Sequence, residues 1–506
     1  MIIMSADYLI FNDVSFAYDT MTLPLLTGIN ASFNRGWTGI IGANGTGKTT
    51  LLRLASGELH PGGGQIEGSE NAVYCRQRTD DAPLALNEMI NSSDSSACRI
   101  RGRLGVEPDW YERWETLSHG ERKRAQIAVA IWAEPAILAV DEPTNHLDAD
   151  AKNHLFQTLC SFNRIGLLVS HDRELLDNLC HQCLFIDPPD TVLRPGNYTQ
   201  GMLQKKKEEE NLQGLYEVKK QAYIKLKEET TKRRRVADKS HRMRSKRGLD
   251  IKDHDSRFKK NLARISNKDG HGGKLLNQLG GRLKQAREEL EGIQLKKKYD
   301  TGIWVSGEKS RGDYLFNLKN NIIDFGGNGS LSFPDLIMHP SDRIALTGLN
   351  GSGKSTLLAH IISRLNPDDD RLTYIPQEIS MESSKKIMAK AKKLSGVKLG
   401  RMMAVVSRLG SRPERLLDSL EPSPGEIRKV MLATGIANEP HLIIMDEPTN
   451  HMDLPSIECL EKALNDCPCG LLMVSHDRML LERLTTGKWN ITKRKQEKKQ
   501  FVLSVS

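Results

Sequence analysis

Two stretches of this sequence decide its fold: Gly42-Ala-Asn-Gly-Thr-Gly-Lys48-Thr49 and Gly348-Leu-Asn-Gly-Ser-Gly-Lys354-Ser355. Both match the pattern GxxxxGK[ST], in which a glycine-rich loop follows a strand and opens a helix. Each follows a short apolar run, Thr38–Ile41 or Ile344–Thr347, and precedes a stretch with helical spacing. Backbone N–H groups of such a loop close around phosphate oxygens, and the helix N-terminus adds a favourable dipole. The sequence therefore predicts two phosphate-binding loops.

Each loop supplies side chains for a nucleoside triphosphate and its Mg²⁺. Lys48 and Lys354 are predicted to neutralise the β- and γ-phosphates, while Thr49 and Ser355 hold the metal ion. The predicted nucleotide-binding residues of the first loop are Gly42, Ala43, Asn44, Gly45, Thr46, Gly47, Lys48, Thr49 and Thr50. Those of the second loop are Gly348, Leu349, Asn350, Gly351, Ser352, Gly353, Lys354, Ser355 and Thr356.

Further motifs recur in the same order after each loop. The loop lysine precedes an aspartate, Asp141 or Asp446, by 93 or 92 residues. It precedes a histidine, His171 or His476, by 123 or 122 residues. One P-loop pattern can arise by chance, but a repeated frame of several motifs indicates tandem duplication of one nucleotide-binding unit.

Each aspartate caps an apolar strand and is followed by a glutamate. Asp141 and Asp446 are predicted to reach Mg²⁺ directly or through water. Glu142 and Glu447 then lie where a carboxylate can polarise an attacking water. The histidine of each VSHDR frame could be structural, but its recurrence in step favours a contact with the γ-phosphate.

Length and composition set the class. The 506 residues are enough for two or three domains, and 38% hydrophobic with 27% charged residues is typical of a soluble globular chain. No apolar run approaches the length of a membrane span, which excludes an integral channel or transporter but not a peripheral subunit. Residues 1–11 have no secretory-signal pattern. The Cys180–Cys183 pair beside His181 has no second pair at zinc spacing, so we expect ordinary thiols in a reduced, cytoplasmic protein.

The positive charge is concentrated in one segment. The chain carries 73 Lys and Arg against 64 Asp and Glu, a net charge of +9. Residues 201–300 hold 29 basic and 15 acidic residues (+14), and the rest of the chain holds 44 and 49 (−5). This excess indicates a polyanionic partner, with nucleic acid first and an anionic membrane surface second.

The same segment has the pattern of a helical hairpin. Residues 196–333 contain no proline, which permits long helices. Two apolar stripes with coiled-coil spacing predict two antiparallel helices, the first of about 40 residues or about 60 Å. The stripes are Leu212, Leu215, Ala222 and Leu226, then Leu276, Leu279, Leu283, Ala286, Leu290 and Ile293. The segment between them, with Arg242, Arg244, Lys246, Arg247, Arg257, Lys259, Lys260 and Arg264, is a basic tip. A plain spacer would not need this charge.

These patterns divide the chain into four parts. We expect a first nucleotide-binding domain at 1–195 and a basic helical hairpin at 196–302, with its tip near 240–274. A second nucleotide-binding domain follows at 303–490, and 491–506 form a short basic C-terminal tail.

Both halves resemble ATP-binding cassettes. The signature motif is present as Leu117-Ser118-His119-Gly120-Glu121 and Ser423-Pro424-Gly425-Glu426, where His119 and Pro424 depart from the usual pattern and leave the relative rates of the sites open. The resemblance implies Q-loop residues Gln77 and Gln377, acting in catalysis and on Mg²⁺, and D-loops Asn145–Asp148 and Asn450–Asp453. It implies that Tyr18 stacks on adenine in the first cassette, and Phe316 is the candidate for this role in the second. Each ATP would lie between the P-loop of one cassette and the signature of the other, which joins Lys48 to Ser423 and Lys354 to Ser118.

The whole chain resembles the F subfamily of these proteins. The expected α/β fold has two tandem ABC-type P-loop domains joined by a long antiparallel α-helical hairpin linker. The resemblance implies a monomeric, cytoplasmic ATPase without membrane subunits, which enters the tRNA exit site of the 70S ribosome. Its linker would reach the P-site tRNA and the large-subunit rRNA of the peptidyl transferase centre. Housekeeping members often carry an arm insertion in the first cassette. Here only 41 residues separate Gln77 from Ser118, against 46 from Gln377 to Ser423, so no large arm fits. The chain is therefore most similar to the antibiotic-resistance members.

Three other functions compete. A housekeeping translation factor of the same subfamily would share every motif. A tandem ATPase of a membrane importer would have similar length but no basic hairpin. A DNA-repair or chromosome ATPase would insert a longer coiled coil or a zinc module into the cassette itself.

Overall fold

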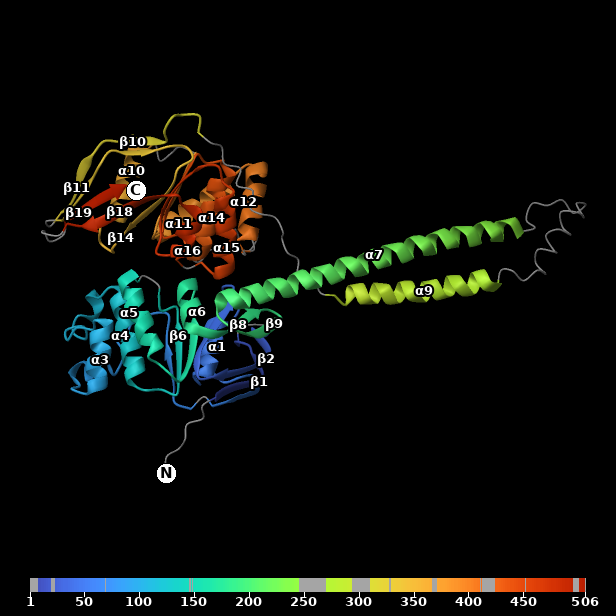
Figure 1. The fold of residues 1–506 in the computed structure, drawn as a ribbon, viewed down its shortest axis with the longest axis horizontal. Coiled ribbons are helices and arrows are strands. Elements are labelled where there is room, and N and C mark those ends of the chain that lie inside the picture. The colour runs from blue at the N-terminus through green and yellow to red at the C-terminus, as the bar shows by residue number, and fades with distance from the viewer. Residues whose placement is uncertain are drawn as a thin grey trace, which may run out of the picture. The chain divides into compact units, whose positions relative to one another are not determined.

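The structure is a computed structural model of the chain. It describes residues 8–19, 23–68, 70–144, 147, 149–244, 270–293, 310–326, 329–365, 371–409, 411, 424–450, 452–494 and 500–505. The chain divides into two compact units: Met1–Gly201 together with Thr301–Ser506, and Met202–Asp300 (Figure 1).

The first half of the larger unit contains two sheets. A three-stranded antiparallel sheet has the order β2-β1-β4, and a six-stranded, mostly parallel sheet has the order β5-β6-β7-β3-β8-β9. The strands are β1 (Tyr8–Phe16), β2 (Leu26–Asn34), β3 (Gly36–Gly42), β4 (Gly63–Glu67), β5 (Ala72–Cys75), β6 (Ile137–Asp141), β7 (Ile165–Val169), β8 (Cys180–Asp187) and β9 (Asp190–Pro195). The helices are α1 (Lys48–Ala55), α2 (Leu86–Asn91), α3 (Ser95–Leu104), α4 (His119–Trp132), α5 (Ala149–Cys160) and α6 (Arg173–Leu179), with a 3₁₀ turn at Trp114–Thr116.

The second half repeats this plan. Its main sheet has the order β11-β12-β19-β18-β14-β17-β16-β15, and β10 pairs with β13. The strands are β10 (Phe316–Leu318), β11 (Asn321–Gly326), β12 (Gly329–Phe333), β13 (Leu336–Met338), β14 (Arg343–Gly348), β15 (Leu372–Ile375), β16 (Leu442–Asp446), β17 (Gly470–Val474), β18 (Gly487–Lys493) and β19 (Gln500–Val505). The helices are α10 (Lys354–Arg364), α11 (Met381–Lys392), α12 (Gly396–Arg408), α14 (Pro424–Ala437), α15 (Leu454–Asn465) and α16 (Arg478–Leu484).

Strand order brings the repeated motifs to one edge of each sheet. In the first half, β7 lies between β3 and β6 and is parallel to both. All five residues of β6 and of β7 are buried, as is usual for the centre of a parallel sheet. The P-loop, the Asp141–Glu142 pair and His171 each follow the carboxyl end of one of these strands. They therefore share the edge at which parallel α/β sheets bind ligands.

The end of the chain differs from the prediction of a separate tail at 491–506. Strand β18 runs to Lys493, and β19 pairs with both β12 and β18 inside the main sheet. Leu503 of β19 is 2% exposed and packs in the core, and Phe501, two positions earlier on the same face of the strand, packs against the same cluster. The basic stretch at 495–499, on which the predicted tail depended, lies outside the described residues.

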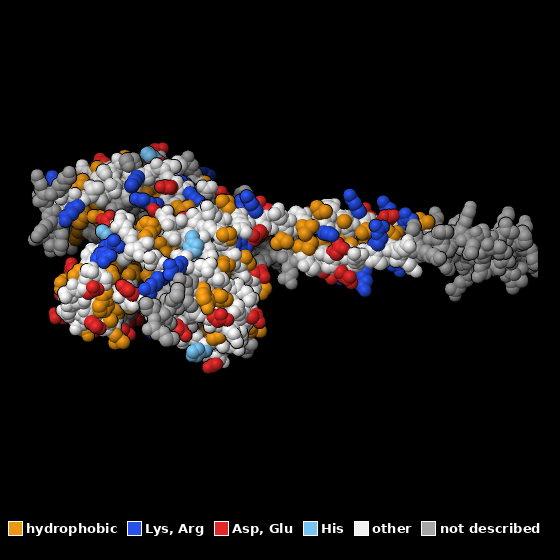
Figure 2. Space-filling view, turned by 60° about the horizontal axis from the view of Figure 1, so that its bottom comes forward, with side chains coloured by type: hydrophobic (Ala, Val, Ile, Leu, Met, Phe, Trp, Pro, Cys, Tyr) orange, Lys and Arg blue, Asp and Glu red, His pale blue; other side chains and the backbone are white. Residues whose placement is uncertain are grey.

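The smaller unit is a helical hairpin, as predicted. Helix α7 (Tyr198–Arg244) has 47 residues, more than the expected 40, and α9 (Gly270–Glu291) has 22. Lys219 Nζ lies 2.5 Å from Glu289 Oε2 and links the two helices. Lys, Arg and exposed apolar side chains share the drawn face of this unit (Figure 2). Residues 245–269, which include most of the predicted tip, lie outside the described residues.

One of the two predicted apolar stripes is wrong in register. In α9, Leu279 is buried and the other predicted positions from 276 to 293 are half-buried. In α7, however, Leu212 and Leu215 are 46% and 47% exposed. Tyr216 and Tyr223 are half-buried instead, on the same side as Leu226. The inward side of α7 is therefore set by large aromatic side chains spaced seven residues apart, a pattern that aliphatic residues alone did not reveal.

The cysteines also differ from the expectation of a fully reduced chain. Cys467 and Cys469 form a disulfide across the single residue Pro468, in the turn that enters β17. Cys180 and Cys183 are buried free thiols. No helix among the described residues is long and apolar enough to cross a membrane.

Candidate ATP sites

The two phosphate loops have the same local structure. Gly47 and Gly353 precede α1 and α10 with φ of 96° and 94°, a left-handed conformation that favours glycine. Lys48 Nζ donates to the carbonyl oxygens of Gly42 and Ala43 at 2.8 and 2.9 Å. Lys354 Nζ donates to those of Gly348 and Leu349 at 2.8 and 3.1 Å. Each lysine is thus held across its own loop, where a phosphate group would take over these contacts.

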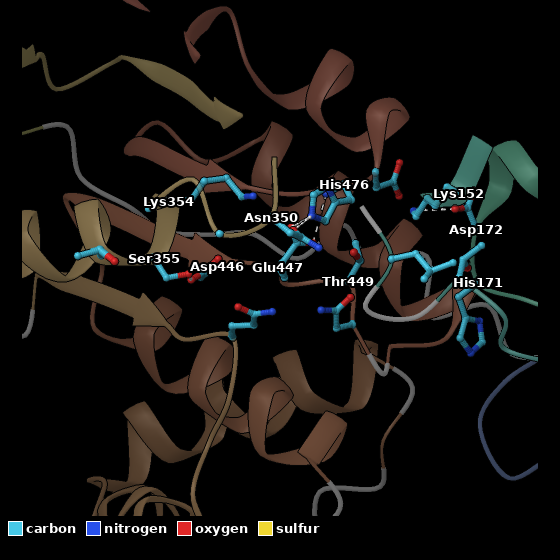
Figure 3. Close-up of a pocket in the computed structure, with 18 of the residues that line it drawn as sticks. Lys152, His171, Asp172, Asn350, Lys354, Ser355, Asp446, Glu447, Thr449 and His476 are labelled. Atoms are coloured by element: carbon cyan, nitrogen blue, oxygen red, sulfur yellow. Dashed lines mark hydrogen bonds and ion pairs between the residues drawn. The ribbon is translucent and has the colours of Figure 1, made fainter. Parts of the chain in front are cut away.

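A hydroxyl and a carboxylate meet beside each loop. Thr49 Oγ1 donates to Asp141 Oδ2 at 2.8 Å, and Ser355 Oγ donates to Asp446 Oδ2 at 2.7 Å. Figure 3 shows the second of these pairs. The Tyr74 hydroxyl donates to the same oxygen of Asp141 at 3.0 Å. Oxygen donors of this kind, one hydroxyl and one carboxylate, fit an octahedral Mg²⁺ that also binds phosphate.

The two glutamates that follow these aspartates are strained and buried. Glu142 and Glu447 have φ of 47° and 50°, which is uncommon for residues other than glycine. Both are 5% exposed. Their backbone N–H groups donate to the carbonyls of Val169 and Val474 at 2.8 and 2.9 Å. The left-handed turn directs each carboxylate towards the histidine that follows the neighbouring strand, and such strain is typical of functional sites.

Each histidine contacts its glutamate. The backbone N–H of His171 donates to Glu142 Oε2 at 3.3 Å, and His171 Nε2 lies 3.1 Å from Glu142 Oε1. In the second cassette, the N–H of His476 donates to Glu447 Oε2 at 3.2 Å, and Nε2 lies 3.5 Å from Oε1. His476 Nε2 also lies 3.2 Å from Asn350 Oδ1 of the phosphate loop.

Burial makes these carboxylates hard to ionise. It raises the pKa of Glu142 to about 8, and the negative charge of Asp141 adds to the effect. Burial likewise raises the pKa of Glu447 to about 7 and that of Asp446 above its ordinary value. Burial also lowers the pKa of Lys48, against the opposing effect of Glu142. A carboxyl group with a pKa near neutrality is suited to accept a proton.

A cavity of about 530 Å³ lies at the second loop (Figure 3). Its lining includes Lys354, Gln377 and Glu447 from the second cassette, and Thr144 and Lys152 from the first. Ser118, predicted to face Lys354, is not among the described residues that line it. The residue predicted to face Lys48, Ser423, lies outside the described part of the chain.

The signature residues have a structural arrangement of their own. Ser118 caps α4 in a capping box: its hydroxyl accepts from the N–H of Glu121, whose carboxylate accepts from the N–H of Ser118 at 2.8 Å. In the second cassette, Gly425 is buried and Glu426 half-buried in the first turn of α14. Gln77 and Gln377 are both exposed at the ends of their strands.

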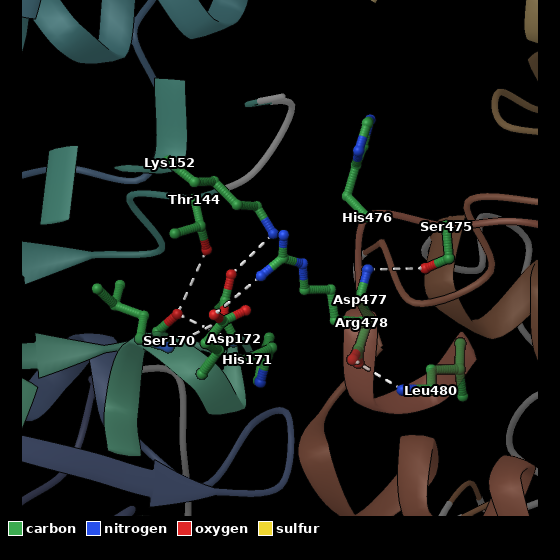
Figure 4. A network of polar contacts seen from close by, with 12 residues as sticks. Thr144, Lys152, Ser170, His171, Asp172, Ser475, His476, Asp477, Arg478 and Leu480 are labelled. Atoms are coloured by element: carbon green, nitrogen blue, oxygen red, sulfur yellow. Dashed lines mark hydrogen bonds and ion pairs between the residues drawn. The ribbon is translucent and has the colours of Figure 1, made fainter. Parts of the chain in front are cut away.

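The turn after each histidine is also duplicated. Ser170 Oγ accepts from the N–H of Asp172 at 3.0 Å, and Ser475 Oγ accepts from that of Asp477 at 3.1 Å (Figure 4). Each aspartate then caps the following helix, α6 or α16. These contacts fix the backbone that carries the two histidines.

Contacts within the larger unit also join the two cassettes. The N–H of Asn44 in the first P-loop donates to Oδ2 of Asp453, a predicted D-loop residue, at 2.7 Å. Arg173, which is 3% exposed, lies 2.5 Å from Glu461 of α15. The other predicted D-loop residues Asn145, His146, Asp148 and His451 lie outside the described residues.

Two kinds of site residue were missed from the sequence. Phe316 is 6% exposed and packs against Trp489, whereas Phe325 contacts Gly353 and lines the cavity. Phe325 lies 23 residues before Gly348, as Tyr18 lies 24 before Gly42, so the repeat spacing could have found it. Tyr18 itself lies with its hydroxyl 3.1 Å from that of Thr50.

The second kind is a buried cation behind each loop. Lys123 donates to the carbonyl of Asp141 at 2.9 Å, and Arg428 donates to the carbonyls of Gln377 and Asn450. Both lie five residues after the signature serine, which is again a repeat that the sequence contains.

Comparisons with known proteins agree with this geometry. The family model described as "ABC transporter" matches residues 26–145 and 332–450. Ribosome protection protein VmlR of Bacillus subtilis is 27% identical, over 95% of this chain and 86% of its own. Energy-dependent translational throttle protein EttA of Escherichia coli O6:H1 is 25% identical, over 91% of this chain and 88% of its own. Among solved structures, "RNase-L Inhibitor" has a TM-score of 0.62 and 17% identity, over 97% of this chain and 90% of that one.

The fold and the duplicated sites define a tandem-cassette ATP hydrolase. Both halves of the chain are similar to ATP-binding cassette domains, and the resemblance of the whole chain to the F subfamily of these proteins is confirmed.

Proposed function

We propose that this chain is a ribosome-bound ATPase that protects ribosomes from antibiotics. The observation that carries the proposal is the combination of two cassettes with a basic helical hairpin, together with full-length similarity to a ribosome protection protein. In the ATP-bound form it enters the tRNA exit site from the cytoplasm. The hairpin then reaches the P-site tRNA and the peptidyl transferase centre, where it displaces a drug.

The site residues take the following roles in this proposal. Lys48 and Lys354 hold the β- and γ-phosphates, and Tyr18 and Phe325 pack against the nucleotide. Thr49 with Asp141, and Ser355 with Asp446, hold Mg²⁺, which offsets phosphate charge when bound; Gln77 and Gln377 complete its surroundings. The remaining nucleotide contacts come from the opposite cassette, through Ser118, Gly120 and Glu121 and through Ser423, Gly425 and Glu426.

Hydrolysis depends on the two glutamate–histidine pairs. Glu142 and Glu447 accept a proton from the attacking water, and their raised pKa values suit this step. His171 and His476 lie within 3.5 Å of these carboxylates, where they orient the glutamate and contact the γ-phosphate. Closure of both sites within one chain makes the monomer the functional form.

The test is cosedimentation with 70S ribosomes in the presence of ATP. The Glu142→Gln/Glu447→Gln variant retains the shape of both sites but cannot accept the proton, so it should bind ATP, fail to turn over and pellet with ribosomes. A Lys48→Ala/Lys354→Ala variant, which cannot hold the phosphates, is the control that should stay in the supernatant. Pelleting with membranes instead of ribosomes would favour an importer subunit.

A housekeeping translation factor is the second candidate. The observation in its favour is a similarity to EttA that is nearly as extensive as the similarity to VmlR. Expression in a drug-sensitive strain separates the two. Protection against at least one lincosamide, pleuromutilin, streptogramin A, macrolide or phenicol drug supports the first proposal, and protection against none leaves the second. Phe258→Ala, at a tip residue outside the described part of the chain, then tests whether the tip acts at the drug site.

A further inference from the structure

A strongly basic surface lies on the second cassette, apart from both candidate ATP sites. Helix α11 (Met381–Lys392) and helix α12 (Gly396–Arg408) span residues 381–408. This segment contains eight Lys and Arg and one Glu, a net charge of +7 in 28 residues. None of these charged side chains lines the cavity at the second P-loop.

The basic residues face solvent because the opposite side of each helix is core. Met388 and Ala391 of α11 pack in one cluster with Met402, Val405 and Val406 of α12. The exposed positions define a surface that we call the lysine face. Its residues are Lys385, Lys386, Lys390, Lys392 and Lys393, extended by the exposed Arg401 and the half-buried Lys398.

Three lysines of the lysine face have no carboxylate of the described residues within ion-pair distance, whereas two of its other basic side chains are paired. Lys386 pairs with Glu382 one turn earlier at 2.8 Å, and Arg401 pairs with Glu439 at 2.8 Å. Among the described residues, no carboxylate lies within 4 Å of the ammonium groups of Lys385, Lys392 or Lys393. Lys386 and Lys390 lie one helical turn apart, where like charges are mildly unfavourable for the helix. Lys390 and Lys392 lie in the last turn of α11, where the helix dipole favours basic side chains by less than about 1 kcal/mol each. Helix stability therefore accounts for only part of this cluster.

The first cassette provides an internal comparison, because it was built from the same unit. Its segment between Q-loop and signature, 78–117, has 5 basic and 8 acidic residues, a net charge of −3. The equivalent segment of the second cassette, 378–422, has 10 basic and 5 acidic residues, a net charge of +5. ATP binding is common to both cassettes and therefore does not explain the difference.

The composition of the lysine face favours a phosphodiester backbone as its partner. Among the described side chains of α11, the exposed positions carry lysine, serine, alanine and the single acidic residue Glu382, and none is large and apolar. Val397 of α12 is the one large apolar side chain exposed within the described part of the two helices, too little to enter a membrane or fill a protein pocket. Lysine is a point charge that recognises phosphate without reading bases. We propose that the lysine face docks on the phosphate backbone of structured ribosomal RNA. This inference rests on the proposed function and assigns a second RNA contact, separate from the hairpin.

The test measures binding to 70S ribosomes as a function of salt, in the ATP-trapped Glu142→Gln/Glu447→Gln background. The variant is Lys385→Gln/Lys392→Gln/Lys393→Gln. Losing three phosphate contacts should weaken binding about tenfold at 150 mM salt and reduce the slope of log affinity against log salt by roughly two to three. The matched control is Arg99→Gln/Arg103→Gln/Lys319→Gln, which removes the same charge from exposed positions elsewhere and should leave the slope nearly unchanged. ATPase activity of each triple variant without the glutamate changes should equal wild type.

Crosslinking identifies the partner class. A photoreactive benzoylphenylalanine at position 392 should crosslink to ribosomal RNA. Crosslinks only to ribosomal protein, or equal affinity and slope for the lysine variant and its parent, would overturn the inference while leaving the proposed function intact. Failure of the trapped parent to bind ribosomes at all would overturn both.

Discussion

Replacing Glu142 by Gln should stabilise the nucleotide-free first cassette, and increasingly so as the pH rises. The carboxyl group is 5% exposed, its pKa is raised to about 8 by burial, and it lies beside Asp141. In the unfolded chain its pKa is near 4.5. Between these values the folded state holds the proton more tightly than the unfolded state does, so this residue's contribution to stability falls as pH rises.

The size of the effect follows from the shift. Each tenfold change in ionisation is worth about 1.4 kcal/mol, so a pKa that moves from 4.5 to about 8 corresponds to roughly 4–5 kcal/mol. The stability of Glu142→Gln minus that of wild type should therefore be smallest at pH 5, grow with pH and level off above pH 8. Glu447→Gln should show a smaller gain, of roughly 3 kcal/mol, that levels off above pH 7.

Tryptophan fluorescence during denaturant unfolding is a suitable assay for Glu142→Gln. Four of the six tryptophans, Trp37, Trp110, Trp114 and Trp132, lie in the first cassette. Glu112→Gln is the matched control, because it removes the same charge from an exposed position that makes no hydrogen bond or ion pair within the described part of the chain, so its effect should not grow with pH. If Glu142→Gln has the same stability relative to wild type at pH 5 and at pH 9, the pKa of Glu142 is not raised in the folded protein.

Three further predictions concern individual contacts. Glu461→Gln should destabilise the protein by about 3–5 kcal/mol in denaturant unfolding, since it removes the carboxylate in contact with the buried Arg173 and leaves only the charge of Asp477 nearby. An effect below about 1 kcal/mol would show that the pair is solvated. Gly353→Ala should abolish ATP binding at the second site only, because the φ of 94° at this position and a clash with Phe325 prevent the loop from forming. Titration of a fluorescent ATP analogue should then show one site instead of two. Two remaining sites would contradict the assignment of this loop. Ser118→Ala should cost about 1 kcal/mol of stability through loss of the α4 capping box, whereas Ser118→Asp should keep most of the stability of wild type. Equal melting temperatures of the two variants would argue against the cap.

The residues that meet in each candidate site could be proposed from the sequence because most of them belong to short local motifs. A P-loop is one strand, one turn and one helix, so its residues and its contact partners follow from eight consecutive positions. The order of strands in a parallel sheet then places Asp141 and His171 near that loop without any knowledge of side-chain packing.

The predictions for the inward side of α7 and for the end of the chain were wrong because both depend on packing between segments that are distant in the sequence. The inward side of α7 depends on which residues meet α9, and Tyr216 and Tyr223 displaced the predicted leucines. Strand β19 pairs with β18, which precedes it in the sequence, and with β12, in which Ser330 is the partner of Gln500. The positive φ of Glu142 and Glu447 was equally hidden, because no residue type at these positions signals a left-handed turn.

Comparison of the two cassettes distinguishes the residues that both ATP sites share from the surface residues that differ between the two halves. The residues proposed to hold phosphate, metal and water are the same or nearly the same in both halves: Lys, Ser or Thr, Asp, Glu and His recur with equivalent contacts. The surfaces between Q-loop and signature differ by eight charges. Since both halves bind the same nucleotide, differences of this kind belong to contacts outside the ATP sites. In a duplicated chain, each half can therefore be compared with the other. A residue that recurs in both halves belongs to the shared chemistry. A cluster that occurs in one half only indicates a partner that contacts that half alone.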